Sequence, residues 1–276
     1  MYKLIATDVD GTLSNDSHEV SEENIAAIKK AIDNGIEVVL CSGRSPASLK
    51  GYEEKIGVTN YGIGFNGAEV YETATRKIIN TSKIPKEAAK KIVNIIRNFN
   101  KEIMIIFHPN TESAILDREV EKHFNEYSSG VSKIVVDRVL EDNIEGDITS
   151  LYAIQDRKIL EGLQREVMKH NLDGFEVFFA LDNSLEFMPS QVNKAYGIRN
   201  LCKHLGIEMY EVVTVGDNYN DVEMIKEAGI GIAVQNAVPQ IRALAGYITR
   251  RTNNESALVE VVDMVIEENE KATRLV

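Results

Sequence analysis

Apolar segments and amphipathic helical segments alternate at both ends of the chain. In the N-terminal part, apolar runs and helical patterns follow one another at 2–7, 21–34, 36–41, 45–56 and 61–65. In the C-terminal part, they do so at 192–205, 211–216, 219–228, 230–234, 237–244, 246–249 and 255–268. This alternation predicts a parallel sheet with helices on both faces.

The middle of the chain has a different pattern. Helical periodicity is expected at 85–99, 117–127 and 157–170. Strands are expected at 102–107, 112–116, 133–137 and 148–154, and a hairpin joins 175–180 to 184–188. Hairpins are typical of an α+β module. We therefore predict an α/β fold with a parallel-sheet core domain (1–82 and 189–276) and an inserted α+β cap domain (83–188).

Composition and cysteine usage limit the class of protein. The chain has 276 residues, of which 43% are hydrophobic and 27% charged, and no apolar run reaches the ~18 residues of a membrane span. Cys41 and Cys202 lie in apolar patterns with no zinc spacing, so both are expected to be buried thiols. Because the first strand begins within two residues, no room is left for a signal peptide. These features predict a cytoplasmic protein.

The formal net charge of −12 narrows the range of partners. An acidic chain is a poor ligand for nucleic acid or for an anionic membrane, and neither is expected. A phosphorylated small molecule would be drawn in only by local positive charge and a metal ion. The sequence leaves the oligomeric state open.

Two carboxylates follow the first apolar run. Asp8 and Asp10 stand two residues apart in the segment Thr-Asp-Val-Asp-Gly-Thr-Leu. Because strand side chains alternate between faces, both carboxylates point the same way. Gly11 then lets the chain turn, and Thr12 adds a hydroxyl. The pair favours a divalent cation and suits phosphoryl transfer, although a plain Asp-Gly turn explains the same residues.

A second acidic motif follows a β-branched run near the C-terminal end. The run ends in Gly216-Asp217, and Asp221 follows four residues later, at the expected start of a helix. Taken alone, this segment is better explained as a capped helix after a strand. In an open parallel sheet, however, ligands bind at the carboxyl ends of strands, where Asp8, Ser42 and Asp217 are all expected.

Ser42 and Lys194 supply two further candidates for anion binding. Ser42-Gly43-Arg44 joins an apolar run to a helix, and a hydroxyl with backbone N–H groups at a helix start can seat an anion. An ordinary junction capped by Ser42 is the alternative. Lys194 lies in the first turn of a helix, where a cation opposes the helix dipole. A lysine directed at a phosphate or carboxylate explains that position, and a surface lysine remains the alternative.

Taken together, these motifs resemble those of the haloacid dehalogenase superfamily, whose core is Rossmann-like. They are Asp8-Val9-Asp10-Gly11-Thr12-Leu13, Ser42-Gly43-Arg44, Lys194 and Gly216-Asp217-Asn218-Tyr219-Asn220-Asp221. The inserted segment resembles the type IIB (C2B) cap of the Cof-like phosphatases, and Asn66-Gly67-Ala68 also matches that branch. The resemblance covers essentially the whole chain.

The resemblance implies a Mg²⁺-dependent phosphatase with an aspartyl-phosphate intermediate. Asp8 would be the nucleophile and Asp10 the general acid and base. The cation would be held by a carboxylate oxygen of Asp8, the backbone carbonyl of Asp10, and Asp217. Asp221 would orient the water shell of the metal.

The remaining positions would handle the substrate. Ser42, Lys194 and Asn220 would hold the transferring phosphoryl group. Arg44 and Asn66 would face the same crevice as substrate-binding residues.

A cap over the site would favour small metabolites, namely sugar phosphates or phosphorylated cofactors. His108, Asp182 and Glu186 are the cap candidates for selecting among them. Two other functions remain open. A sugar phosphomutase of the same fold would need to bind a second phosphate, yet the arginines of the cap are scattered in sequence. A non-enzymatic phospho-acceptor or regulatory protein would not need Asp10 as a proton carrier.

Overall fold

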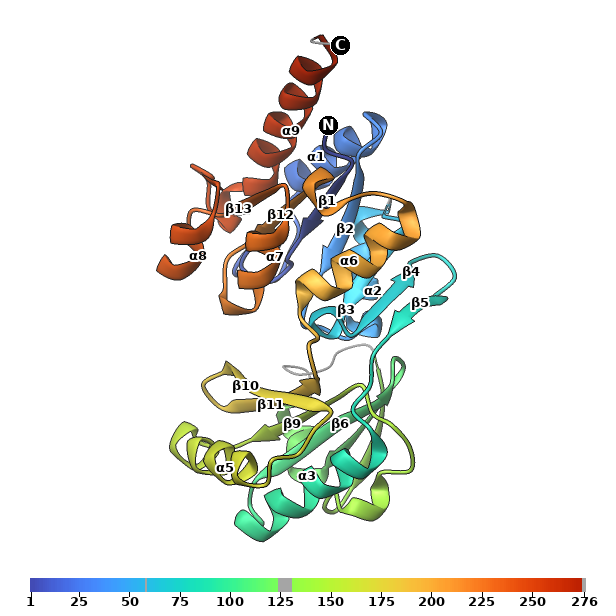
Figure 1. Cartoon of the computed structure of the whole chain (residues 1–276), viewed down its shortest axis with the longest axis vertical. Coiled ribbons are helices and arrows are strands. Elements are labelled where there is room, and N and C mark those ends of the chain that lie inside the picture. The colour runs from blue at the N-terminus through green and yellow to red at the C-terminus, as the bar shows by residue number, and fades with distance from the viewer. Residues whose placement is uncertain (58, 124–130, 275–276) are drawn as a thin grey trace. The chain divides into compact units, whose positions relative to one another are not determined.

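The computed structural model describes residues 1–57, 59–123 and 131–274, which form two compact units. The first unit consists of Met1–Gly43, Leu49–Asn80 and Asn193–Val276, and the second consists of Arg44–Ser48 and Thr81–Val192. Figure 1 shows the helices and strands of both units. The predicted α/β fold is confirmed.

The first unit contains a sheet with the strand order β14-β13-β12-β1-β2-β3-β4-β5. The strands are β1 (Leu4–Thr7), β2 (Glu37–Cys41), β3 (Tyr61–Gly64), β4 (Glu69–Glu72), β5 (Ile78–Thr81), β12 (Val212–Gly216), β13 (Ile230–Ala233) and β14 (Tyr247–Ile248). Strand β1 lies between β2 and β12 and is parallel to both. Its carboxyl end is therefore central in the sheet.

The sheet departs from the prediction at one edge. Strand β4 pairs with β3 in the antiparallel direction, and β5 follows it, so the sheet is not wholly parallel. Charged and threonine residues interrupt any apolar run between 69 and 81, and no helical pattern separates the two strands. The sequence signal for this hairpin was therefore too weak to be recognised.

Helices cover both faces of this sheet. They are α1 (Glu22–Asp33), α2 (Pro46–Ile56), α6 (Lys194–Leu205), α7 (Val222–Glu227), α8 (Pro239–Leu244) and α9 (Ala257–Arg274). Figure 1 shows α6 lying across one face. Alternate residues of β1 face opposite sides: Ile5 packs in the cluster that contains α1 and α9, whereas Leu4 and Ala6 pack with α6. This double coverage explains why the central strands are predominantly apolar.

The second unit contains a sheet with the order β10-β11-β9-β6-β7-β8. Its elements are α3 (Lys86–Phe99), β6 (Met104–Asn110), β7 (Ser113–Asp117), β8 (Ser132–Val136), β9 (Ser150–Ile154), α5 (Arg157–Lys169), β10 (Phe175–Leu181) and β11 (Ser184–Pro189). The pairs β10–β11, β11–β9, β9–β6 and β6–β7 are antiparallel. The predicted hairpin is present. Where a helix is expected at 117–127, the structure has a 3₁₀ segment at Arg118–His123. Residues 124–127 of the expected helix lie outside the described ranges.

No helix within the described ranges has both the length and the apolar character needed to cross a membrane. Cys41 and Cys202 are both buried free thiols.

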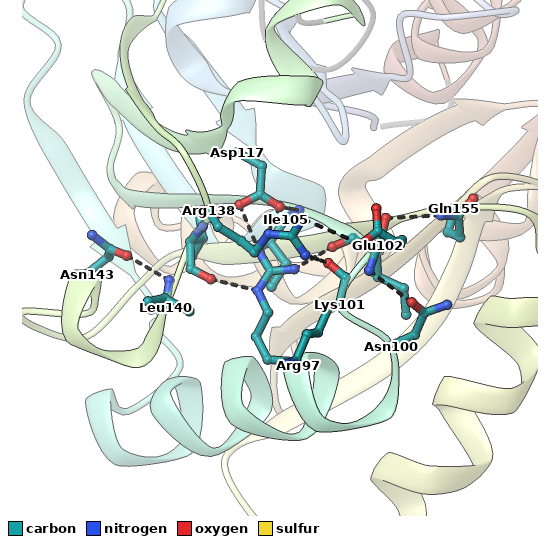
Figure 2. Close-up of polar contacts among 12 residues, drawn as sticks. Arg97, Asn100, Lys101, Glu102, Ile105, Asp117, Arg138, Leu140, Asn143 and Gln155 are labelled. Carbon is teal, nitrogen blue, oxygen red and sulfur yellow. Dashed lines mark hydrogen bonds and ion pairs between the residues drawn. The ribbon is translucent and has the colours of Figure 1, made fainter.

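A buried arginine ties several elements of the second unit together (Figure 2). Arg97 on α3 donates from Nη2 to both carboxylate oxygens of Asp117, at 2.8 and 2.7 Å. Its other nitrogens donate to the carbonyl oxygens of Val139 and Ile103. Asp117 in turn accepts from the backbone amide of Ile105 at 2.8 Å. The pair thus satisfies backbone groups of Val139, Ile103 and Ile105 in a buried position.

Replacing Arg97 by Met is expected to cost about 3–5 kcal/mol of unfolding free energy, because the carboxylate of Asp117 would stay buried without its counter-charge. The matched control is Arg118→Met, since Arg118 pairs with Asp137 on the surface and exposed pairs contribute only about 0–1 kcal/mol. Urea unfolding of the full chain, followed by circular dichroism, gives both values. Equal losses in the two variants would contradict a stabilising role for the buried pair.

Candidate active site

Asp8 lies immediately after β1, at the carboxyl end of the sheet's central strand. Its amide donates to the carbonyl of Val215 on β12 at 2.9 Å, so the parallel pairing continues up to this residue. The side chain is only 7% exposed. The strand thus delivers a buried carboxylate to the edge where ligands bind in such sheets.

Lys194 is fully buried and joins two carboxylates. Its Nζ lies 2.5 Å from Oδ1 of Asp8 and 2.6 Å from Oδ1 of Asp221. Asn193 caps α6 by accepting from the amide of Tyr196 at 2.9 Å, which fixes the first turn that carries Lys194. Burial by itself lowers the pKa of Lys194, but the charges of Asp221 and Asp8 outweigh it and raise the pKa. The lysine is therefore a permanent cation at this position.

Asp221 also organises the loop after β12. Its Oδ2 accepts from the backbone amides of Asp217 (2.9 Å) and Asn218 (3.0 Å). A Cβ at Gly216 would lie 2.5 Å from this carboxyl group, so the close approach needs a glycine there. The role expected for Asp221 was to orient water around a metal; in the structure its contacts are to Lys194 and to backbone amides.

Asp217 is the third carboxylate of the cluster. Its Oδ1 accepts from the hydroxyl of Thr12 at 2.6 Å. Burial raises the pKa of Asp217, and the charge of Asp221 adds to this, although the Thr12 hydroxyl opposes it. Burial also raises the pKa of Asp8; Lys194 opposes the shift, and the charges of Asp221 and Asp217 reinforce it. The carboxylates are thus held close together against their mutual repulsion.

The charge balance and the donor atoms of this cluster fit a divalent cation. Carboxylate oxygens of Asp8, Asp217 and Asp221 lie within 4.8 Å of one another. In this group of four side chains, Lys194 supplies one positive charge and the three ionised carboxylates supply three negative charges. The charges of the group therefore sum to −2. Hard ions such as Mg²⁺ prefer oxygen ligands of this kind. Because Asp221 is already engaged by Lys194 and two amides, Asp8 and Asp217 are the carboxylates best placed to bind the ion.

Ser42, Asn66 and Asn220 come together beside the cluster. The carbonyl of Ser42 accepts from the amide of Asn66 at 2.9 Å, and Nδ2 of Asn220 donates to Oδ1 of Asn66 at 3.1 Å. Asn66 adopts a left-handed conformation with φ 51°, which asparagine tolerates well. A Cβ at Gly67 would lie 2.1 Å from the carbonyl of Asn193, so glycine is needed where this turn meets the start of α6.

Arg44 follows Gly43, is partly buried, and belongs to the second unit. The cap candidates also lie in that unit. His108 and Glu186 are buried, and burial raises the pKa of Glu186 to about 8. The side chain of Asp182 is exposed and lies 3.6 Å from Nη1 of Arg157. Of the three, His108 and Glu186 are the ones embedded in the sheet.

Asp10 is more exposed than Asp8, and its carboxylate contacts a residue that sequence reasoning missed. Nδ1 of His18 lies 3.3 Å from Oδ1 of Asp10. His18 falls in a polar segment without hydrophobic periodicity, and its spacing from Asp10 matches no motif considered above. A histidine in an irregular loop gives no signal beyond its residue type.

Three carboxylates and a buried lysine thus lie together at the carboxyl ends of parallel strands, an arrangement suited to an enzyme that binds anionic groups. Residues 5–262 match the family model of haloacid dehalogenase-like hydrolases. The chain belongs to this family, and the resemblance found in its motifs is confirmed.

Individual relatives agree with this membership. The chain is 28% identical to 5-amino-6-(5-phospho-D-ribitylamino)uracil phosphatase YcsE of Bacillus subtilis, over 94% of each chain. It is 29% identical to the crystal structure of TM0651 from Thermotoga maritima, with a TM-score of 0.83, covering 96% of this chain and 97% of that one. The fold is also that of the subclass IIB sugar phosphatase BT4131, at 21% identity and a TM-score of 0.79, covering 95% and 98%. The prediction of a phosphatase is therefore confirmed.

Proposed function

We propose that this protein is a Mg²⁺-dependent phosphatase that hydrolyses small phosphorylated metabolites through a phosphorylated Asp8. The observation that carries the proposal is the cluster at the end of β1, in which one buried lysine contacts two of three closely spaced carboxylates. When bound by Asp8, Asp217 and the backbone carbonyl of Asp10, the cation would neutralise charge on the phosphoryl group.

In the first step, a carboxylate oxygen of Asp8 bonds to phosphorus while the ester P–O bond breaks. Asp10, as general acid, gives its proton to the departing alcohol oxygen. Lys194, with Ser42 and Asn220, holds the phosphoryl oxygens and reduces their repulsion from Asp8. In the second step, Asp10 takes a proton from water, the water oxygen bonds to phosphorus, and the bond to Asp8 breaks to release phosphate.

The proposed substrate class rests on the relatives. We propose that residues 1–82 and 189–276 form the catalytic domain and that 83–188 form the cap. Arg44 and Asn66 are proposed as substrate-binding residues on the basis of the motif resemblance alone. YcsE, named above, acts on a phosphorylated ribityl compound, and BT4131 is named as a sugar phosphatase. Sugar phosphates and phosphorylated cofactors are therefore the first candidates, and a cytoplasmic location remains a prediction.

The function is tested by inorganic phosphate release from a panel of phosphorylated metabolites. Release is expected with Mg²⁺ and should fall to background with EDTA, because the charge of −2 in the cluster would be left uncompensated. Release that persists in EDTA would contradict metal dependence. Phosphate transfer that appears only with an added sugar bisphosphate would identify a mutase instead.

A further inference from the structure

The contact between His18 and Asp10 is poorly explained by fold stability. The two side chains are 69% and 40% exposed, and ion pairs of such exposure contribute little to stability. His18 also has φ 59°, a left-handed conformation that is uncommon for residues other than glycine, although histidine and asparagine adopt it more readily than most. The chain therefore holds a residue of uncommon backbone conformation in a contact that stabilises the fold little.

A polar turn produces this conformation. The side-chain oxygen of Asn15 accepts from the amides of Ser17 (3.0 Å) and Glu19 (2.9 Å). The amide of His18 donates to the carbonyl of Asn15 at 2.8 Å. These bonds close a tight loop around His18, so the backbone fixes the direction of its Cα–Cβ bond.

The loop is in turn fastened to the C-terminal part of the same unit. Asp16 accepts from Nδ2 of Asn253 at 3.0 Å and from Nδ2 of Asn254 at 2.9 Å. Asn253 is buried and also donates to the carbonyl of Ser14 at 3.1 Å. The turn that carries His18 is thus anchored to the segment at Asn253 and Asn254.

We propose that His18 is a positioning residue for Asp10. Its Nδ1–H donates to Oδ1 of Asp10, which fixes the plane of the carboxyl group and keeps that oxygen as an acceptor. The exchangeable proton is then confined to Oδ2. This inference rests on the proposed function, in which Asp10 is the acid and base.

Both steps of the reaction use the same oxygen in this arrangement. Oδ2–H of Asp10 gives its proton to the leaving alcohol oxygen as the ester bond breaks. Oδ2 then accepts a proton from the water whose oxygen bonds to phosphorus. His18 neither gains nor loses a proton in either step; it only holds Oδ1.

The test compares His18→Gly with His18→Asn. Both glycine and asparagine tolerate φ near 60°, so neither variant is strained by the backbone. Asparagine places an N–H donor close to the position of Nδ1, and glycine provides none. The substrate is the alkyl phosphate that the wild type hydrolyses fastest. His18→Gly is expected to lower kcat for this substrate about 10–100-fold, with little change in KM. This loss is part of the rate enhancement that a general acid contributes. His18→Asn is expected to restore most of the rate.

A second substrate separates positioning of the acid from general distortion of the site. p-Nitrophenolate is a good leaving group that needs no proton, so the pre-steady-state burst of p-nitrophenol should keep its wild-type rate in His18→Gly. Steady-state turnover should still fall, because the second step uses Asp10 as a base. A burst slowed as much as the alkyl phosphate reaction would overturn the proposal, as would equal kcat values for the wild type and His18→Gly.

A structural readout does not depend on activity. Crystal structures of the wild type and of His18→Asn should each show one conformation of the Asp10 carboxyl group, and His18→Gly should show more than one. A single unchanged conformation in His18→Gly overturns the positioning role even if no substrate is found. Absence of phosphate release from the wild type would instead refute the proposed function, so the two failures are distinguishable.

Discussion

Asp8→Asn is expected to abolish phosphate release, with a loss of about 10⁴–10⁶-fold in kcat, as for other enzymes that lose their nucleophile. An amide oxygen is a far weaker nucleophile than a carboxylate oxygen. The substitution also removes one negative charge from the proposed metal ligands. The side chain is nearly isosteric, so the fold should be kept. Phosphate release with Mg²⁺ and the best substrate of the panel measures the effect.

The matched control is Asp263→Asn, an identical substitution at an exposed aspartate on α9 that pairs with Lys30. It should leave kcat unchanged. Acid-quenched samples should contain phosphorylated protein for the wild type and none for Asp8→Asn. Labelling that persists in the variant would show that another residue is the nucleophile.

Much of the fold could be predicted because its signals are local. Apolar runs separated by amphipathic segments are sufficient to indicate β1, β2 and β12, and the ends of these strands place Asp8, Ser42 and Asp217. The β4–β5 hairpin could not be predicted in the same way, since each strand has only four residues and β5 is partly exposed.

The site was less accessible to sequence reasoning, because its contacts join residues far apart in the chain. Lys194 could be recognised as unusually placed in a first helical turn. Its full burial and its bridge to Asp8, 186 positions away, depend on how α6 packs across the sheet. His18 was missed because it lies in an irregular loop, where the sequence has no periodic pattern of hydrophobic residues.

Replacing Lys194 by Met is expected to impair both stability and activity. The substitution leaves the carboxylates of Asp8 and Asp221 buried without their common cation. Breaking a buried ion pair in this way typically costs about 3–5 kcal/mol. Lys30→Met is the control, since its partner Asp263 lies at the surface and such pairs are worth about 0–1 kcal/mol. Urea unfolding at neutral pH compares the two variants.

The stability deficit of Lys194→Met should depend on pH with a definite sign. The pKa of Asp8 is already raised by burial, and removing Lys194 raises it further. A carboxyl group with a raised pKa in the folded state stabilises the fold at low pH, and that stability is lost as the pH rises through the raised value. The gap between variant and wild type should therefore widen with increasing pH. A gap that narrows with increasing pH would contradict this electrostatic account.

Lys194→Met also separates the roles of the two cations proposed for the site, the ammonium group of Lys194 and Mg²⁺. If Mg²⁺ binds between Asp8 and Asp217, adding it should recover part of the lost stability, because a ligand of the folded state shifts unfolding by mass action. It should not recover activity, since the phosphoryl oxygens would still lack the ammonium group, and loss of one such group costs about 10²–10³-fold. Stability regained without activity would assign separate roles to Lys194 and the metal, whereas recovery of both would make the lysine a structural counter-ion alone.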